Sequence, residues 1–167
     1  LITHPGQGND TLAQLKGKPI MLGRGGQLTF FQWLKADFGY TDDQVRPYTF
    51  NVAPFLADKQ AIQQGYITSE PYTIEKEGRI KPHSILLADF GYDTYATLIE
   101  ATTKMVKENP ALVQRFVDAS ILGWVSFMKD DPSAAYALIK KDNPDMTDDK
   151  MVFSREAMRA SGIIDSG

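Results

Sequence analysis

Apolar positions in the first part of the chain follow two rhythms, one helical and one extended. Leu28, Phe31, Leu34 and Phe38 recur at helical spacing and stop at Gly39, which predicts a helix closed by a glycine. Shorter apolar runs between turn residues predict strands at 19–22, 46–52, 66–68 and 84–88. Further short helices are expected at 41–44, 58–64 and 72–77. This alternation favours an α/β fold with a mostly parallel sheet.

After about residue 95 the pattern becomes helical. The apolar run 95–102 predicts one more strand, and three helices are expected after it. Each helix begins with a residue that caps helices, in two cases followed by a proline that suits the first helical position. The three start signals are Asn109-Pro110, Asp131-Pro132 and Thr147. The last helix is expected to stop at Gly162.

Composition narrows the class of protein. The 167 residues are 43% apolar and 23% charged, which is typical of a soluble globular protein. A net charge of −3 provides no basic surface for nucleic acid, and no apolar run approaches the ~18–20 residues that a membrane span requires. The absence of cysteine excludes a disulfide, a thiolate zinc site and a thiol nucleophile.

The chain carries no recognisable catalytic constellation. His4 and His83, its only histidines, stand beside prolines without metal-ligand spacing, so we expect structural or surface roles for both. Glu70, Glu75 and Glu77 are close in sequence, but a solvated helix face explains this grouping. We therefore expect no catalytic residue, no metal site and no cofactor.

Two segments are candidate binding loops, because each joins a strand to a helix. Residues 23–27 lead through glycines into a helix N-terminus, where backbone N–H groups can hold an anion or the polar edge of a ligand. The alternative is a tight turn with nothing bound. Residues 68–72 place a carboxylate, a proline and a tyrosine together after a strand. In open α/β sheets ligands lie beyond the carboxyl ends of strands, so both segments are expected near one another at that edge.

Three blocks of sequence resemble a known family. They are LKGKPIMLGRGGQLTFFQWL (15–34), ADKQAIQQGYITSEPY (57–72) and ENPALVQRFVDASILGW (108–124). In order and spacing they resemble the substrate-binding proteins of ABC importers. The similar subgroup is named for its likeness to thiamine-pyrimidine synthase and includes nitrate, sulfonate, pyrimidine-precursor and riboflavin binders.

The resemblance implies a periplasmic-binding-protein type II-like fold, in which two lobes close on a ligand. In that fold residues 1–95 would be the α/β second lobe. Residues 96–167 would be a return crossover strand and C-terminal helices of the first lobe. Because the chain starts without an initiator Met, we expect a fragment that lacks most of the first lobe.

The same resemblance assigns ligand-binding roles to specific residues. In the glycine-rich segment these are Arg24, Gly25, Gly26 and Gln27, and elsewhere they are Asn51, Ser69, Glu70 and Tyr72. Glu70 would accept hydrogen bonds from a ligand N–H group, and Tyr72 would stack on a ring. Gln27 stands where many relatives have a serine, which disfavours a sulfonate or nitrate and favours an uncharged or heteroaromatic ligand.

The implied function is that of a solute-binding component of a bacterial ABC import system. It would be periplasmic, or extracellular and membrane-anchored. Its partners would be a small, vitamin-precursor-like molecule and, transiently, a membrane permease, with no nucleic acid. One alternative is a pyrimidine-synthase-type enzyme on the same fold, which is disfavoured because such enzymes need a cysteine-rich metal-binding motif. Another alternative is the ligand-sensing domain of a regulator or kinase.

Two structural expectations follow from the two-lobed arrangement. Residues 1–3 should pair with the strand near 96–101, since both would cross between the lobes. The C-terminal helices should also expose an apolar patch, because their large side chains cannot all face one small core. These side chains are Phe116, Leu122, Trp124 and Phe127.

Overall fold

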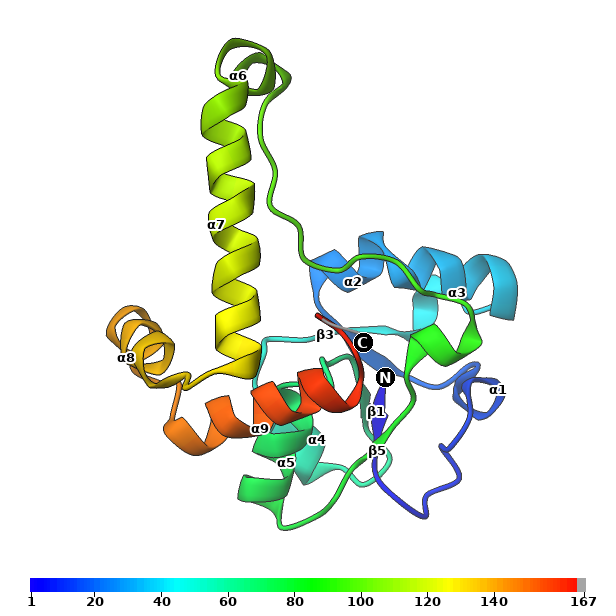
Figure 1. Cartoon of the computed structure of the whole chain (residues 1–167). Helices are drawn as coiled ribbons and strands as arrows, with labels where there is room; N and C mark the ends of the chain where they lie inside the picture. Colours follow the sequence, from blue (N-terminus) through cyan, green and yellow to red (C-terminus); the bar gives the residue numbers. More distant parts are fainter. Residues whose placement is uncertain (165–167) are drawn as a thin grey trace. The chain divides into compact units, whose positions relative to one another are not determined.

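The computed structural model describes residues 1–164. The chain divides into two compact units, residues 1–94 and residues 95–167, and each unit is described by itself. The first unit contains a five-stranded sheet of order β3-β2-β4-β1-β5 (Figure 1). Its strands are β1 (Ile2–Thr3), β2 (Ile20–Leu22), β3 (Val45–Pro47), β4 (Ile62–Gln63) and β5 (His83–Ser84).

The sheet is mixed rather than mostly parallel. β2 is parallel to β3 and β4, whereas β1 is antiparallel to β4 and β5. Met21 of β2 and Ile2 of β1 both face Gln63 of β4, on its two sides. The α/β class expected from the sequence is thus confirmed, but parallel pairing is confined to the β3-β2-β4 part of the sheet.

Helices form two cores with this sheet, because successive strand residues point to opposite faces. One core contains Ile62 together with Leu15 of α1 and Phe31 of α3. The other core contains Phe55 of α4 and Ile74 of α5. The helices of this unit are α1 (Leu12–Leu15), α2 (Arg24–Leu28), α3 (Phe30–Phe38), α4 (Ala53–Ala57) and α5 (Glu70–Gly78), with the 3₁₀ helices η1 (Asp42–Gln44) and η2 (Leu87–Phe90).

Local sequence signals determine the turn after α3. The helix ends at Gly39, whose φ of 68° lies in the left-handed region that glycine tolerates. Thr41 and Gln44 then form the reciprocal capping box of η1, as their spacing predicts. The buried Gln44 amide also donates to the carbonyl of Leu15 at 3.0 Å, and the Tyr40 hydroxyl donates to that of Leu12 at 2.8 Å. Side chains of this turn thereby hold α1 against α3.

Several predicted elements of the first unit are wrong. Residues 58–64 are not a helix, because α4 ends at Ala57 and Ile62–Gln63 form strand β4. Residues 66–68 are not a strand, and the predicted strand 84–88 is reduced to β5 and followed by η2. Pro54 starts α4 early, and the pairing of β4 between β2 and β1 overrides the local pattern. Leu28, expected on the buried face of a helix, is 66% exposed in α2.

The predicted pairing of residues 1–3 with residues 96–101 is also wrong. β1 lies inside the sheet and already has β4 on one side and β5 on the other. A strand with neighbours on both sides has no backbone donors or acceptors left for a third strand. Residues 96–101, which lie within the described part of the chain, form no strand.

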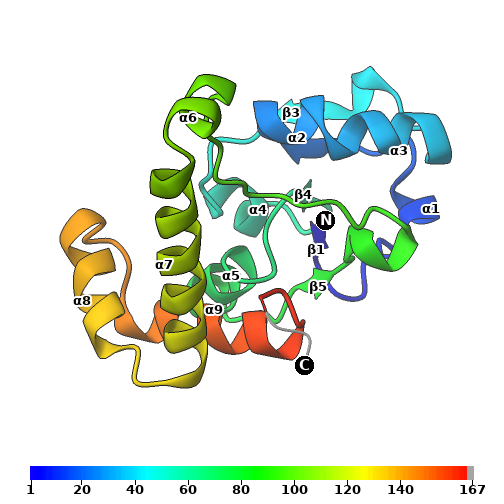
Figure 2. The same ribbon diagram turned by 45° about the horizontal axis from the view of Figure 1, so that its top comes forward.

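The second unit is helical. In both views α6 lies at one end of the long helix α7, and α8 and α9 lie near its other end (Figures 1 and 2). The helices are α6 (Thr103–Glu108), α7 (Pro110–Lys129), α8 (Ser133–Asp142) and α9 (Asp148–Ala160). The start signals before α7 and α9 are confirmed, and α8 begins one residue after the predicted proline. Hydrogen bonds from Ser133 to Asp131 hold this start and lower the pKa of Asp131.

The second unit has a small core. Among its described residues, Met128 of α7 and Met151 of α9 are the buried apolar side chains. Arg155 of α9 donates from Nε to the carbonyl of Phe127 at 2.7 Å, and from Nη2 to those of Met128 at 3.0 Å and Asp130 at 2.8 Å. One guanidinium therefore caps the C-terminus of α7 and fixes α9 against it.

Apolar side chains of α7 are exposed, as expected. Phe116, Leu122 and Trp124 are 56%, 69% and 42% exposed, whereas Phe127 is partly buried. No helix in the described part of the chain is long and apolar enough to span a membrane.

Candidate functional site

The candidate site lies at the edge of the first unit where three parallel strands end. β2 leads into Gly23, β3 into Tyr48, and β4 into Gln64. Two of these exits are joined directly, because the Gly23 N–H donates to Gln64 Oε1 at 2.7 Å. Carboxyl ends of neighbouring parallel strands are where open α/β sheets hold ligands, and the structure brings polar and aromatic side chains together at this edge.

The glycine-rich segment is a helical turn rather than an open loop. Gly23 is the N-cap of α2, and the Gln27 side chain donates back to the carbonyl of Leu22 at 3.0 Å. Gly26 is buried, and a Cβ there would lie 2.5 Å from Gln64 Oε1, so packing explains that glycine. Of the four residues assigned to this segment, Arg24 and Gly25 face solvent. Gln27 and Gly26 take part in the fold itself.

Glu70 opens helix α5 and is held by donors from two other segments. The Tyr48 hydroxyl donates to its Oε1 at 3.3 Å, and the backbone N–H of Tyr66 donates to its Oε2 at 2.8 Å. Burial, and next the charge of Glu70, raise the pKa of Tyr48, so this hydroxyl remains a donor. Glu70 is itself only partly buried, and each carboxylate oxygen can accept a further hydrogen bond. The carboxylate is therefore oriented by the fold while still able to accept from a ligand.

The fully buried side chain of Gln63 lies next to this pair. It is near enough to the Tyr48 hydroxyl to lower the pKa of Tyr48, against the larger effects of burial and of Glu70. Within residues 1–164, neither its Nε2 nor its Oε1 has a hydrogen-bond partner of good geometry. Burying an unpaired amide costs about 1–3 kcal/mol, so Gln63 is a polar group that the described fold leaves unsatisfied.

Three other predicted site residues have local contacts or positions at helix starts. Asn51 Oδ1 accepts from the Ala53 N–H at 2.8 Å in the turn that precedes α4, and Ser69 is the N-cap residue of α5. Tyr72 is on α5, where its hydroxyl accepts from Lys76 Nζ at 3.0 Å and the ammonium lies 5.3 Å from the ring centroid. The predicted turn at 68–72 is thus a helix start, in which Glu70 points to the other strand exits.

Sequence reasoning missed four residues at this edge, namely Tyr48, Phe50, Gln64 and Tyr66. The Phe50 ring lies 5.0 Å from that of Tyr48, between centroids, and is 75% exposed. Tyr66 is 57% exposed, and its N–H holds Glu70 as described. These aromatic residues were expected inside strands, at 46–52 and 66–68, whereas β3 ends at Pro47 and β4 at Gln63, so no local signal marked them as part of a site.

Both histidines have the structural roles expected from the sequence. The buried His4 ring stacks on Phe55 at 4.1 Å, and its Nε2 lies 2.7 Å from the Phe55 carbonyl. His83 Nε2 lies 3.1 Å from the carbonyl of Asp10. No group of three or more histidine or carboxylate side chains in the described chain could hold a metal ion.

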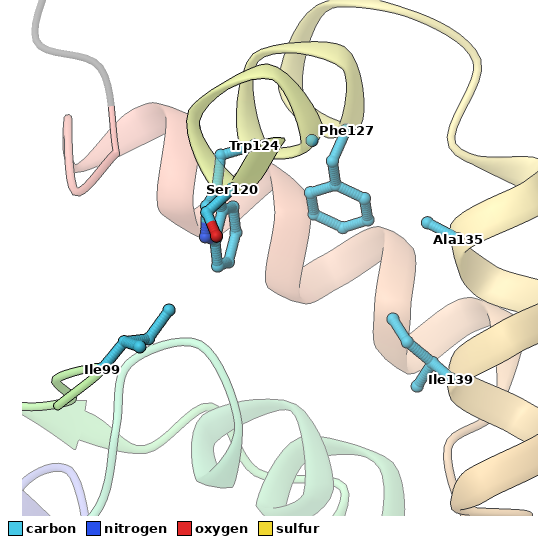
Figure 3. A pocket seen from close by; sticks show the side chains of 7 residues that line it. Ile99, Ser120, Trp124, Phe127, Ala135 and Ile139 are labelled. Carbon is cyan, nitrogen blue, oxygen red and sulfur yellow. The ribbon is translucent and has the colours of Figure 1, made fainter. Parts of the chain in front are cut away.

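A separate apolar groove of about 290 Å³ lies within the second unit. Trp124 and Phe127 project into it from α7, and Ala135 and Ile139 project from α8 (Figure 3). Ser120 is a polar lining residue, but its hydroxyl donates to the Phe116 carbonyl at 2.8 Å. Ligand pockets normally add a few converging polar groups to their apolar walls, and this groove has no comparable set among its lining residues.

The first unit has the α/β fold expected from the sequence, and comparison with known families shows to which family the chain belongs. A family model described as NMT1/THI5 like matches residues 1–135, and the chain belongs to this family. It is the thiamine-pyrimidine-synthase-like substrate-binding family, which consists mostly of ABC substrate-binding proteins and also includes synthases. No curated protein and no solved structure matches the chain significantly.

Proposed function

We propose that the chain is the solute-binding component of an ABC import system, which captures a small ligand at the carboxyl edge of the first unit's sheet. In this proposal the first unit is the second lobe of a two-lobed binding protein. The helices of the second unit belong to the C-terminal part of the other lobe. The protein acts in the periplasm, or outside the cell on a membrane anchor, and delivers its ligand to a permease.

One observation carries the proposal: Glu70 is oriented by two donors yet remains partly exposed. A carboxylate that served only the fold would have little reason to lie at the junction of three strand exits. Held in this way, it loses little freedom when a ligand donor binds, which favours affinity. The site therefore suits a ligand that presents an N–H group.

The charges at this edge also restrict the ligand. Glu70 repels an anion that approaches its carboxylate, and Gln27 provides no hydroxyl for a sulfonate or nitrate. Arg24 and Gly25 are exposed at the start of α2 and can contact a polar edge of the ligand. An uncharged, heteroaromatic, vitamin-precursor-like molecule fits these features better than an inorganic anion.

A solute panel tests the binding function. The chain is heated with each of a set of small solutes at about 1 mM, including nitrate, sulfonates, nucleobases and vitamin precursors. A solute present at about 100 times its Kd adds roughly 2.7 kcal/mol to the free energy of unfolding and raises the melting temperature by several degrees. A panel in which nothing raises the melting temperature contradicts the proposal.

The Glu70→Gln variant then tests the site. Losing a charge-assisted hydrogen bond to the ligand costs about 1.5–3 kcal/mol, which is roughly tenfold to hundredfold in affinity. Glu77→Gln is the matched control, because Glu77 is exposed on the same helix. Glu70 also accepts two hydrogen bonds within the fold, so affinity is measured directly by calorimetry and not inferred from melting. Equal affinity of both variants would remove Glu70 from the site.

The synthase members of the family make an enzyme the second candidate. We expect the solute that binds to be recovered chemically unchanged after prolonged incubation, as mass spectrometry can show. Conversion of that solute would favour the synthase reading. Loss of its uptake in cells that carry Glu70→Gln, with uptake kept in Glu77→Gln, would favour the import role.

A further inference from the structure

We propose that Phe50 is the stacking wall of the ligand site and that the ligand is therefore a flat ring with an N–H edge. This inference rests on the proposed function and names its ligand class. The role moves from Tyr72, which lies on α5 against Lys76, to a residue on the exit of β3. A ring that is 75% exposed and packs against Tyr48, which donates to Glu70, offers a free π face to a ligand.

The backbone at Phe50 supports a functional role. Its φ of 60° lies in the left-handed region, which bulky residues rarely adopt, and Asn51 directly after it is a residue that tolerates such a conformation better. Strained non-glycine residues of this kind cluster at ligand sites. Because most of the ring is exposed, burial of Phe50 does not offset this strain.

Contacts connect Phe50 to the exits of β2 and β3. A Cβ at Gly23 would lie 3.1 Å from Phe50 Cζ, so the tip of the ring lies over the end of β2. Its other neighbour is the Tyr48 ring at 5.0 Å, and the Tyr48 hydroxyl donates to Glu70. The ring wall and the hydrogen-bond acceptor thus belong to one contiguous set of contacts.

Tyr48 is the positioning residue that links the Phe50 ring to the Glu70 carboxylate. Its ring backs Phe50, its hydroxyl orients Glu70, and the unsatisfied amide of the buried Gln63 lies next to that hydroxyl. A ligand that stacks on Phe50 therefore lies close to a residue that orients the Glu70 carboxylate. Such an arrangement suits a ring that carries an N–H group.

Three probes separate the ring from the N–H group. They are 4-aminopyrimidine, which has both features, pyrimidine, which lacks the amine, and cyclohexylamine, which lacks the flat ring. Binding to the full 167-residue chain is measured by ligand-observed NMR, which also reports the upfield shift of a proton stacked over an aromatic ring. Phe50→Asn removes the ring and keeps a residue that tolerates positive φ, and Phe50→Tyr keeps the ring. Leu28→Gln is the control for a change at an exposed apolar residue of the same unit.

The wild-type chain should bind 4-aminopyrimidine most tightly. Phe50→Asn should weaken both pyrimidines about tenfold, abolish the upfield shift and leave cyclohexylamine unchanged, with a melting temperature equal to or above that of the wild type. Phe50→Tyr and Leu28→Gln should bind like the wild type. Glu70→Gln should weaken 4-aminopyrimidine and cyclohexylamine but not pyrimidine.

Other results overturn the inference. If Phe50→Asn binds both pyrimidines like the wild type while Glu70→Gln binds 4-aminopyrimidine more weakly, Phe50 is not the wall and the proposed function stands. If the wild type prefers cyclohexylamine, or binds no probe but binds another solute of the panel, the flat-ring class is wrong and the function again stands. A chain that binds neither the probes nor any panel solute overturns both.

Discussion

The two units use their apolar side chains in opposite ways. The first unit encloses many of its apolar side chains between a sheet and helices on both faces, and Phe31, Phe55 and Leu34 are fully buried. In the second unit Phe116, Ile121 and Leu122 are more than half exposed. A sheet that is covered by helices on both faces forms two cores even when its elements are short. The four helices of the second unit bury few apolar side chains against one another, so much of their apolar surface stays exposed.

The difference suggests that the units contribute unequally to the free energy of unfolding. The chain offers a reporter for each, because Trp33 lies in the first unit and Trp124 in the second. Trp33 packs against Phe38 and Tyr92 with ring centroids about 5 Å apart, whereas Trp124 is 42% exposed. Chains that keep only one of the two tryptophans allow the unfolding of each unit to be followed by fluorescence.

The largest expected effect concerns the phenylalanines of the two units. Phe55→Ala should lower the free energy of unfolding of the first unit by about 3–5 kcal/mol, because it leaves a cavity and removes the ring that stacks on His4. Phe116→Ala on α7, where the ring is exposed, should change the free energy of unfolding of the second unit by less than about 0.5 kcal/mol. Urea titration measures both values. Equal losses in the two variants would contradict the contrast between the units.

A smaller effect is expected where the second unit depends on polar contacts. Arg155→Met should destabilise the packing of α9 on α7 by about 2–3 kcal/mol, since it removes three hydrogen bonds from one guanidinium to carbonyls that end α7. Arg115→Met, at an exposed position of α7, is the control. The loss of stability should appear in the unfolding curve followed by Trp124 fluorescence and not in the curve followed by Trp33 fluorescence. A response of both reporters would show that the units unfold together.

The third effect concerns a buried hydroxyl of the first unit and depends on pH. Burial raises the pKa of Tyr40 from 10 to about 12, and its hydroxyl donates to the Leu12 carbonyl. Below pH 10 the removal of this hydrogen bond in Tyr40→Phe should cost about 1 kcal/mol. Between pH 10 and 12 the unfolded chain loses the tyrosine proton before the folded chain does, so the wild type loses stability as the pH rises. The difference in the free energy of unfolding between the wild type and Tyr40→Phe therefore narrows. A gap that stays constant across this range would contradict the assignment.

The smallest effect is expected at surface ion pairs, and it should be alike in the two units. Lys35 and Asp42 lie 2.8 Å apart in the first unit, and Lys140 and Asp148 lie 2.7 Å apart in the second. Exposed pairs of this kind contribute about 0.2–1 kcal/mol, and salt screens them. Asp42→Asn and Asp148→Asn should each cost a few tenths of a kcal/mol, less still in 1 M NaCl. A cost above about 2 kcal/mol at either site would reveal a larger network.

Signals that act over a few residues were predictable from the sequence. The stop of α3 at Gly39, the capping box of Thr41 and Gln44, and the start of α7 at Asn109-Pro110 all depend on neighbours within one helical turn. Glu70 was likewise expected next to a helix start, and it opens α5, but the strand expected directly before it at 66–68 is absent. The role of Glu70 in ligand binding remains a prediction.

Only the tertiary structure decided which residues pair and meet. Ile62–Gln63 became a strand because β2 and β1 leave a place between them, although their own pattern looked helical. Glu70 obtained its two donors from Tyr48 and Tyr66, which lie on the exits of other strands. Sheet pairing and side-chain contacts join residues far apart in the chain, and the local pattern of a short segment carries no information about its distant partners. The sequence by itself therefore determined the α/β class and several helix ends, and the packing of the sheet determined where Phe50, Tyr48 and Glu70 come together.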